Sequence, residues 1–256
     1  MVSTLTKQFK PIVLIPSFNP GPKGLETAIS ARKFFSPILW ISDGSTDESD
    51  DLIEAYFIED PGFTLLRCAR NQGKGAAIYA GLIKASEEGY SHVLTMDADG
   101  QHPPNRIQDF LDAARKYPDD MILGTPVFGR DAPRIRVEGR KISNTWVRLE
   151  TFGAEIGDSL FGFRVYPLEA LLNTMQNTQS MRRFDFDPEA VVRLSWKGLK
   201  AINIECDVRY PDASEGGISH FHYVRDNLIL SLMHLRLFSG FILRLPMFLI
   251  GRLRGA

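Results

Sequence analysis

The sequence predicts an α/β protein: a mostly parallel central sheet flanked by helices, with amphipathic helices at the C-terminus. Two observations predict the sheet. Short apolar runs alternate with segments of helical period along the first half of the chain, and a loop rich in Gly, Pro and polar residues follows each run. The length of 256 residues suffices for one large domain, or for one domain with an appendage.

Five apolar runs are predicted strands, and the segments between them are predicted helices. The strands are PIVLIP (11–16), PILWIS (37–42), FTLLRCA (63–69), HVLTM (92–96) and MILGTP (121–126). The helices are GLETAISARKFF (24–35), DESDDLIEAYF (47–57), KGAAIYAGLIKASEEG (74–89) and NRIQDFLDAARKY (105–117). Such alternation is typical of βαβ units. Ligands of these sheets bind beyond the carboxyl ends of the strands.

Composition and missing motifs exclude several functions. A net charge of −1 argues against a general nucleic-acid binder. Cys68 and Cys206 form no CxxC or Cys/His cluster, so neither a disulfide nor a structural zinc is predicted. No GxGxxG follows the first strand, and no GxxxxGK[ST] occurs. Because no signal-peptide-like apolar stretch precedes the first strand, we expect a cytoplasmic protein.

A metal site is predicted in LTMDADGQHPP (94–104). Asp97, Asp99 and Gln101 stand at alternate positions after an apolar run, so an extended backbone would place them on one face. Carboxylate and amide oxygens suit Mg²⁺ or Mn²⁺, ions that keep positions open for substrate phosphates. His102 is predicted to point away from this set. A solvated acidic turn is the alternative.

Two further strand-end loops carry candidate nucleotide-binding residues. Asp43 follows the second predicted strand, where its carboxylate would accept a hydrogen bond from a nucleobase. In NQGKG (71–75), Gly73 and Gly75 would permit close approach of a nucleotide while Lys74 supplies charge. A simple loop with a solvated lysine is the alternative.

Five stretches resemble, in order, the motifs of family 2 glycosyltransferases with the GT-A fold. They are VLIPSFNP, ISDGSTDES, RNQGKGAAIYAGL, MDADGQHPP and GDSLFGFRVYP, and they look most like those of the dolichol- or polyprenyl-phosphate sugar synthases. The resemblance covers residues 11–198. It implies a nucleotide-sugar donor (UDP- or GDP-linked), a divalent metal, and transfer with inversion. It also implies that Asp43 reads the base beside Lys74, that Asp97, Asp99 and Gln101 hold the metal, and that Pro16, Phe18 and Ala98 line the donor site.

Cations for the phosphates are sought in two later segments. RDAPRIRVEGRK (130–141) is a candidate mobile basic loop over the phosphates, with Arg140 as its donor-binding residue. In SEGGISHF (214–221), His220 is predicted near the diphosphate or acceptor as a hydrogen-bond donor. A solvated segment and an ordinary capping role are the respective alternatives.

A hydroxyl acceptor would need a carboxylate base. Asp185 in RRFDFDPEAVVR (182–193) is the first choice, predicted to share a strand face with Asp187, and Asp158 in GDSLFGFR (157–164) is the second. Asp187, which precedes Pro188, is also a ready helix N-cap. A phosphate acceptor is already anionic and needs no base.

The chain departs from the family pattern at three places. Ser42 stands where the family has the first of two paired acids, and Phe161 stands where a serine usually precedes GFR. The synthases carry Arg and Lys in an RxxGxSK-like stretch, whereas this chain has Ser214 and His220 there. Losing two fixed cations favours a neutral or weakly charged acceptor.

The C-terminal segment differs in composition from the rest, which divides the chain into a catalytic domain (1–220) and a tail (221–256). The tail reads as two apolar helices joined near Ser239 and Gly240, with Pro246 interrupting the second. Its arginines and His234 break the apolar tracts too often for a membrane-spanning helix. We therefore expect helices lying on the inner face of the cytoplasmic membrane. Packing on the catalytic domain and a homodimer interface are the alternatives.

Together these features predict a metal-dependent inverting glycosyltransferase with a membrane-associated lipid or lipid-linked acceptor. A polyprenyl-phosphate sugar synthase is the nearest alternative. A nucleotidyltransferase is less favoured, because PSFNPGPKG (16–24) is a poor version of the Gly-rich basic loop such enzymes carry after the first strand. A non-catalytic nucleotide-sugar binder would need neither an acceptor base nor the apolar tail.

Overall fold

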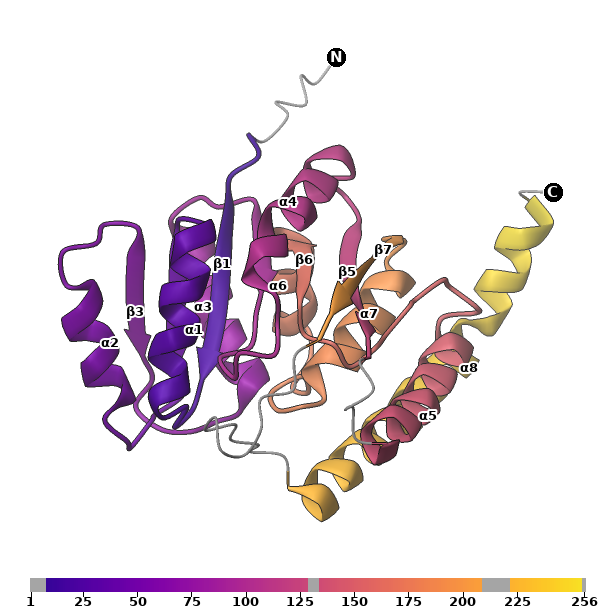
Figure 1. Cartoon of the computed structure of the whole chain (residues 1–256). Helices are drawn as coiled ribbons and strands as arrows, with labels where there is room; N and C mark the ends of the chain where they lie inside the picture. Colours follow the sequence, from indigo (N-terminus) through magenta and orange to yellow (C-terminus); the bar gives the residue numbers. More distant parts are fainter. Residues whose placement is uncertain (1–7, 129–133, 209–221, 255–256) are drawn as a thin grey trace.

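A seven-stranded sheet forms the centre of the computed structural model, which describes residues 8–128, 134–208 and 222–254 (Figure 1). The strands lie in the order β3-β2-β1-β4-β6-β5-β7. All neighbouring strands are parallel except where β6 pairs with β4 and β5. The mostly parallel sheet predicted from the sequence is confirmed.

The five predicted strands are all present. They are β1 (Pro11–Ser17), β2 (Ile38–Ser42), β3 (Phe63–Arg67), β4 (His92–Thr95) and β5 (Met121–Val127). Every residue of β2 and β4 is buried, because helices cover both faces of the sheet there. Two further strands, β6 (Arg164–Pro167) and β7 (Ala201–Asp207), were not predicted.

The four predicted helices are also present, and four more follow. The first set is α1 (Pro22–Phe34), α2 (Ser49–Phe57), α3 (Lys74–Glu87) and α4 (Ile107–Lys116), the last preceded by a 3₁₀ turn at Pro104–Arg106. The second set is α5 (Arg134–Glu150), α6 (Leu168–Gln176), α7 (Phe186–Trp196) and α8 (Tyr223–Arg254).

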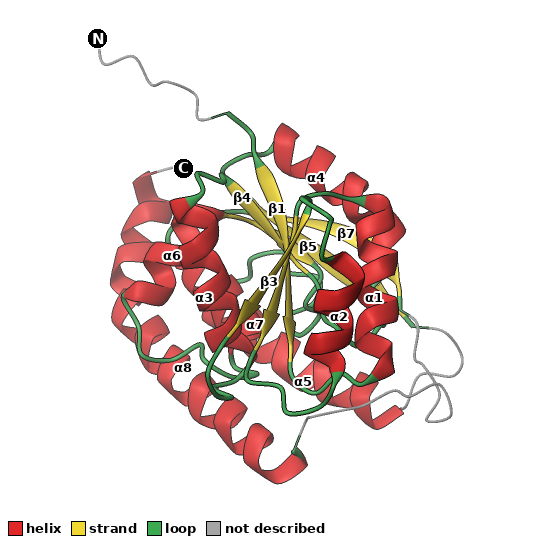
Figure 2. Cartoon of the chain, turned by 90° about the vertical axis from the view of Figure 1, so that its left-hand side faces the viewer, coloured by secondary structure: helices red, strands yellow, loops and turns green. Residues whose placement is uncertain are grey.

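Two apolar cores lie on opposite faces of the sheet. Side chains of α1, α2 and α4 pack on one face, and those of α3, α6 and α7 pack on the other. Figure 2 views the sheet between these two layers. The sandwich fixes the strand ends, and the loops that follow β1, β2 and β4 meet at one edge.

The expected basic loop at 130–141 is wrong over most of its length, because α5 begins at Arg134. Ser143, Val147 and Glu150 recur at helical spacing and are buried. The many charged residues of 130–141 obscured the helical spacing of the apolar and buried positions in this part of the sequence. Residues 129–133 lie outside the described part of the chain.

The expected break near Ser239 is also wrong, since α8 is a single helix of 32 residues. Gly240 serves packing, because a Cβ atom there would stand 2.9 Å from the Trp196 ring. Ser239 Oγ donates to the Leu235 carbonyl within the helix at 2.9 Å. Pro246 is accommodated inside the helix, where it removes one backbone donor.

Helix α8 lies along the body of the protein, packed on α5 and α7. His234 Nδ1 stands 3.0 Å from Glu150 Oε1, and Arg236 Nη2 stands 2.5 Å from Glu189 Oε2. Met233 and Leu237 are buried on the same side. By length and composition alone, Val224–Pro246 is long and apolar enough to cross a membrane, which differs from the expectation that its charged residues interrupt the apolar tracts too often.

Candidate active site

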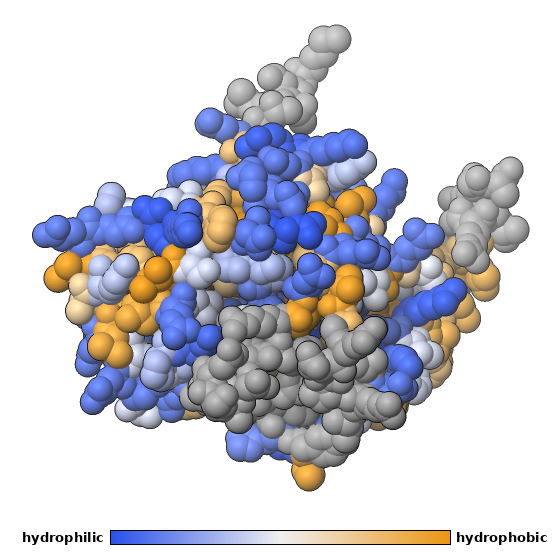
Figure 3. All heavy atoms as spheres, viewed as in Figure 1, coloured by the Kyte–Doolittle hydropathy of each residue, from blue (hydrophilic) through white to orange (hydrophobic). Residues whose placement is uncertain are grey.

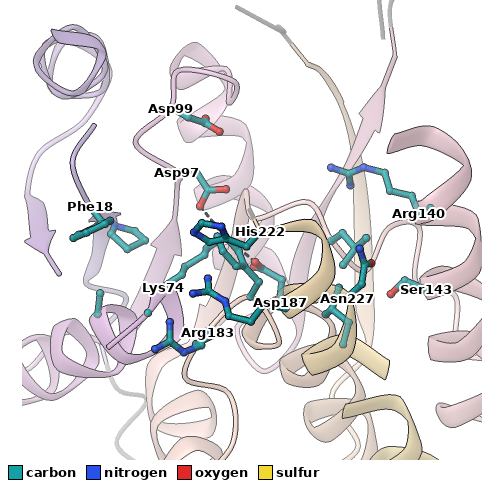
Figure 4. Close-up of a pocket in the computed structure, with 18 of the residues that line it drawn as sticks. Phe18, Lys74, Asp97, Asp99, Arg140, Ser143, Arg183, Asp187, His222 and Asn227 are labelled. Carbon is teal, nitrogen blue, oxygen red and sulfur yellow. Dashed lines mark hydrogen bonds and ion pairs between the residues drawn. The ribbon is translucent and has the colours of Figure 1, made fainter. Parts of the chain in front are cut away.

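A cavity of about 1270 Å³ opens at the edge of the sheet where β1, β2 and β4 end. Nine of the predicted site residues line it: Pro16, Phe18, Asp43, Lys74, Asp97, Ala98, Asp99, Gln101 and Arg140. Figure 4 shows Asp97, Lys74 and Asp187 between Phe18 at one end and Ser143 at the other. Asp158 and Asp185 do not line the cavity, and His220 lies outside the described residues.

Antiparallel strand β6 brings a glycine against Asp97. Thr95, the last residue of β4, pairs with Arg164, the first residue of β6. Thr95 Oγ1 also donates to the Gly162 carbonyl at 2.8 Å. A Cβ atom at Gly162 would stand 2.6 Å from Lys74 Nζ and 3.0 Å from Asp97 Oδ2. Only glycine leaves room for these two side chains.

Lys74 joins two carboxylates that lie far apart in the sequence. Its Nζ stands 2.7 Å from Asp97 Oδ1 and 2.7 Å from Asp187 Oδ2 (Figure 4). Burial would lower the pKa of Lys74, but the two carboxylates together raise it above its ordinary value. Burial likewise opposes ionisation of Asp97, and Lys74 nevertheless holds the pKa of Asp97 below its usual range. Lys74 and Asp97 are therefore both charged at neutral pH.

A loop laid over the start of α3 brings Asp187 to Lys74. The Ala76 N–H donates to the Arg182 carbonyl at 2.9 Å. Cβ atoms at Gly73 and Gly75 would collide with the carbonyls of Arg182 and Met181. The close approach that these glycines were predicted to allow is thus made by the protein's own backbone.

Asp187 is buried, and one of its carboxylate oxygens has no hydrogen-bond partner among the described residues. The residue is 4% exposed, and the oxygen is Oδ1. Arg164 Nη1 lies 4.0 Å from that oxygen and donates to the Asp187 carbonyl at 2.6 Å. Asp187 thus meets the cavity with its carboxylate held by Lys74 and its backbone held by Arg164.

The two acids predicted as catalytic bases are both engaged by other groups. Asp185 accepts the N–H of Met181 at 3.0 Å and that of Arg183 at 2.8 Å. The extended face that it was expected to share with Asp187 does not exist, because α7 begins at Phe186. Geometry gives no support to Asp185 as a base.

Asp158 closes a turn in the same way. Its Oδ1 accepts the N–H groups of Leu160 at 2.8 Å and Phe161 at 2.6 Å. Arg140 Nη1 donates to the same oxygen at 2.7 Å, so this predicted donor-binding arginine is paired inside the protein. Asp158 therefore anchors Arg140 and the turn before β6, and the base assignment lacks geometric support.

Asp43 orders the loop before α3 while lining the cavity. Its carboxylate accepts the N–H groups of Gln72 at 3.0 Å and Gly73 at 2.6 Å. Burial raises the pKa of Asp43, against the opposing effect of these N–H groups and of Arg183. Recognition of a base by Asp43 stays a prediction.

The acidic motif turns instead of running straight. Gly100 has φ +75°, and Asp99 Oδ1 accepts the Gln101 N–H at 2.9 Å. The chain also brings His102 back under Asp97, where its Nδ1 accepts the Asp97 N–H at 2.9 Å. The prediction that His102 points away is therefore wrong. Burial lowers the pKa of His102 to about 4, so its ring is neutral at physiological pH.

The residues of this turn fit a hard divalent cation. Asp97, Asp99 and Gln101 line one cavity and offer two carboxylates and an amide oxygen. Within residues 8–128, 134–208 and 222–254, no three His, Cys, Asp or Glu side chains converge on one point. Such a sparse set matches Mg²⁺ or Mn²⁺, which complete their coordination with water and substrate phosphates.

Sequence reasoning missed Arg183 and His222, which also line the cavity (Figure 4). The Arg183 guanidinium lies near enough to Asp43 to oppose the effect of burial on that carboxyl. The RR pair before FDFD was the available signal for Arg183. Arg183 and Lys74 thus place two cations beside the carboxylates that line this part of the cavity.

Comparison with known proteins places the chain among sugar-transferring enzymes. A model described as glycosyl transferase family 2 matches residues 12–174. The polyprenol monophosphomannose synthase of Mycolicibacterium smegmatis is 28% identical over 204 residues, which are 77% of this chain and 75% of that protein. The undecaprenyl-phosphate 4-deoxy-4-formamido-L-arabinose transferase of Serratia proteamaculans is 32% identical over 172 residues, 63% of this chain and 51% of that protein.

Among solved structures, a glucosyl-3-phosphoglycerate synthase from Mycobacterium tuberculosis shares the fold. The crystal structure with Mn²⁺, UDP and phosphoglyceric acid has a TM-score of 0.64 and 16% identity, covering 93% of this chain and 78% of that chain. At this identity the likeness establishes the fold alone.

Proposed function

The chain belongs to glycosyl transferase family 2, and from that membership we propose that it transfers a sugar from a nucleoside diphosphate sugar to a membrane lipid phosphate of the polyprenyl-phosphate class. We further propose that transfer needs Mg²⁺ or Mn²⁺ and inverts the anomeric carbon. One observation carries the proposal: Lys74 bridges Asp97, at the edge where a donor diphosphate would sit, to Asp187 deeper in the same cavity.

Departure of the nucleoside diphosphate builds negative charge on its leaving oxygen. A divalent ion on Asp97, Asp99 and Gln101 would supply electrostatic stabilisation of that charge. Lys74 holds Asp97 in place through their ion pair. Arg183 adds a second cation on the side of Asp43.

The state of the acids supports a phosphate acceptor. Asp158 and Asp185 are both occupied by backbone N–H groups, and Asp187 is paired with Lys74. An acceptor phosphate is a nucleophile without help from a base, so this arrangement suits it. The relatives named for polyprenol and undecaprenyl phosphates favour the same acceptor class. Ser214 and His220, which favoured a less charged acceptor, lie outside the described residues.

The donor is tested by binding. Thermal unfolding would be followed with UDP-, GDP- and dTDP-sugars, each with Mn²⁺ and with EDTA. We expect one nucleotide class to raise the melting temperature in the presence of Mn²⁺ only, because the metal and the diphosphate bind together. A chain stabilised by none of these donors would not be a nucleotide-sugar enzyme.

Gly162→Ala is predicted to lower transfer by about tenfold or more, because the added methyl group displaces Lys74 or Asp97. The change is measured as kcat/KM beside the unfolding midpoint. Gly139→Ala is the matched control, since a Cβ atom there meets nothing within 4 Å. Equal activity of the two variants would show that the contact at Gly162 does not matter.

We also propose that α8 rests on a membrane surface. The face of α8 turned away from the domain exposes large apolar side chains, namely Val224, Leu228, Leu232, Leu243 and Leu249. Figure 3 shows apolar side chains gathered along the C-terminal part of this helix. Because contacts to Glu150 and Glu189 tie the opposite face to the domain, the helix is arranged to lie flat.

Leu243→Glu combined with Leu249→Glu should reduce binding to anionic liposomes by about tenfold or more, since both side chains are exposed and would lose their burial in lipid. Co-sedimentation measures this. Ile58→Glu, at an equally exposed apolar position after α2, is the control and should bind like the unmodified chain. Unchanged binding of the double variant would remove α8 from the membrane contact.

A further inference from the structure

The cavity continues well beyond the residues that serve a donor. Its far part lies between α5 and α8 and is lined by apolar side chains of both helices, namely Ile142, Trp146, Leu230, Leu235 and Phe238. We call this part the α5/α8 groove. An apolar lining offers no hydrogen-bonding or charged groups to a nucleotide or a divalent ion.

The two ends of the cavity differ in polarity, with Ser231 and His234 of α8 among the lining residues between them. On α8, Arg225 and Asn227 line its polar part, whereas Leu235 and Phe238 line the far end. Arg225 and Phe238 lie about 20 Å apart along the helix at 1.5 Å per residue. The cavity is therefore matched to an amphiphile, with an anionic group near Lys74 and an apolar tail beyond it.

The groove is a built feature of the fold. Trp146 packs edge-to-face on Phe238, with 5.9 Å between ring centroids, and lies over His234 at 6.1 Å. His234 is buried between Glu150, at 3.0 Å from Nδ1, and Ser143, at 3.2 Å from Nε2. These polar contacts across the two helices fix the groove wall in place.

Two apolar side chains of the groove stand open to solvent in the protein alone. Ile142 is 65% exposed and Leu235 is 64% exposed. Covering Ile142 or Leu235 with hydrocarbon would contribute a favourable free energy similar to that of burying an aliphatic side chain in a protein core. A ligand bound in the polar part of the cavity could extend an apolar chain into the groove and bury these side chains, because both parts belong to one cavity.

We propose that the α5/α8 groove holds the hydrocarbon chain of the acceptor lipid next to its phosphate. The inference rests on the proposed function for the nature of the acceptor. The groove is continuous with the site of Lys74 and Asp187, so a chain attached to the reacting phosphate would enter both parts at once. The groove thus selects acceptors by the chain nearest the phosphate.

The test uses binding, so it does not depend on turnover. Dodecyl phosphate, kept below its micelle concentration, and butyl phosphate are titrated onto the full chain by calorimetry. The unmodified protein should bind the dodecyl compound at least about tenfold more tightly. Leu235→Glu should abolish that preference and leave the affinity for butyl phosphate unchanged. Leu232→Glu, on the same helix, 54% exposed and not among the residues that line the cavity, should keep the preference.

Equal affinity for dodecyl and butyl phosphate would contradict the proposal that the groove holds a hydrocarbon chain. Equal effects of Leu235→Glu and Leu232→Glu on the preference for dodecyl phosphate would contradict it as well. A change in molecular mass of the Leu235→Glu variant by light scattering would also overturn it, since the groove would then be covered by a second copy. Failure of the proposed function looks different. If the protein transferred sugar only to a soluble acceptor but still bound dodecyl phosphate more tightly than butyl phosphate, the proposed lipid acceptor would be refuted. The proposal that the groove binds an apolar chain would stand.

Discussion

Lys74→Met is expected to reduce sugar transfer at least about a hundredfold and to lower the free energy of unfolding by about 3 kcal/mol. The lysine is the shared partner of Asp97 and Asp187, at 2.7 Å from each. Without it, Asp97 and Asp187 lose their shared cation, and breaking a buried pair from one side leaves the other charge uncompensated. Steady-state kinetics and denaturant unfolding measure the two effects.

Lys84→Met is the matched control for this result. Lys84 lies on the same helix, and its partner Glu88 is an exposed i,i+4 neighbour, so we expect a change in unfolding free energy of less than about 0.5 kcal/mol. In a double-mutant cycle, Asp187→Asn should restore part of the stability of Lys74→Met without restoring transfer. Additive effects of the two substitutions would contradict the bridge.

Asp97→Asn is the second substitution with a large expected effect. The change keeps the shape of the side chain but removes the charge that faces Lys74 and a metal. We expect at least a hundredfold loss of kcat/KM and a higher Mn²⁺ concentration for half-maximal rate, because an amide is a weaker ligand than a carboxylate. Activity against Mn²⁺ concentration measures both.

Asp109→Asn provides the comparison, since Asp109 pairs with Arg106 on the exposed side of α4, away from the cavity. That variant should match the unmodified chain in both rate and Mn²⁺ dependence. If Asp97→Asn also matched it, Asp97 would have no part in metal binding or in transfer.

The alternation of apolar and polar segments predicted the fold from β1 to β5, because each element there is buried by a regular pattern. Strand β6 begins with a buried arginine and ends with a proline, so it lacks the apolar run by which β4, which is equally short, was predicted. Strand β7 lies at the edge of the sheet with only Cys206 buried, so it lacks the apolar run of an inner strand. In α8, Gly240 and Ser239 looked like breakers, but one serves packing on Trp196 and the other bonds within the helix.

The candidate site was predictable where it depends on strand ends and not where it depends on long-range packing. Asp43 and Asp97 follow strands and could be found from the sequence. The contact of Lys74 with Asp187 spans 113 residues and depends on the loop over the start of α3, which has no local signature. Residue type alone also cannot show whether an aspartate acts as a base or has a structural role. Asp158 and Asp185 have carboxylates that accept backbone N–H groups, which only the structure reveals.

The central claim is that this cavity joins a donor sugar to a lipid phosphate. The most direct measurement incubates the chain with a radiolabelled nucleotide sugar, Mn²⁺ and a polyprenyl phosphate, and then determines the label in the organic phase and the anomeric configuration of the product. The account predicts a labelled lipid-phosphate sugar of inverted configuration, formed only with both metal and lipid phosphate and absent with Lys74→Met. Transfer that continued with excess EDTA, or that used a lipid alcohol and not its phosphate, would contradict it.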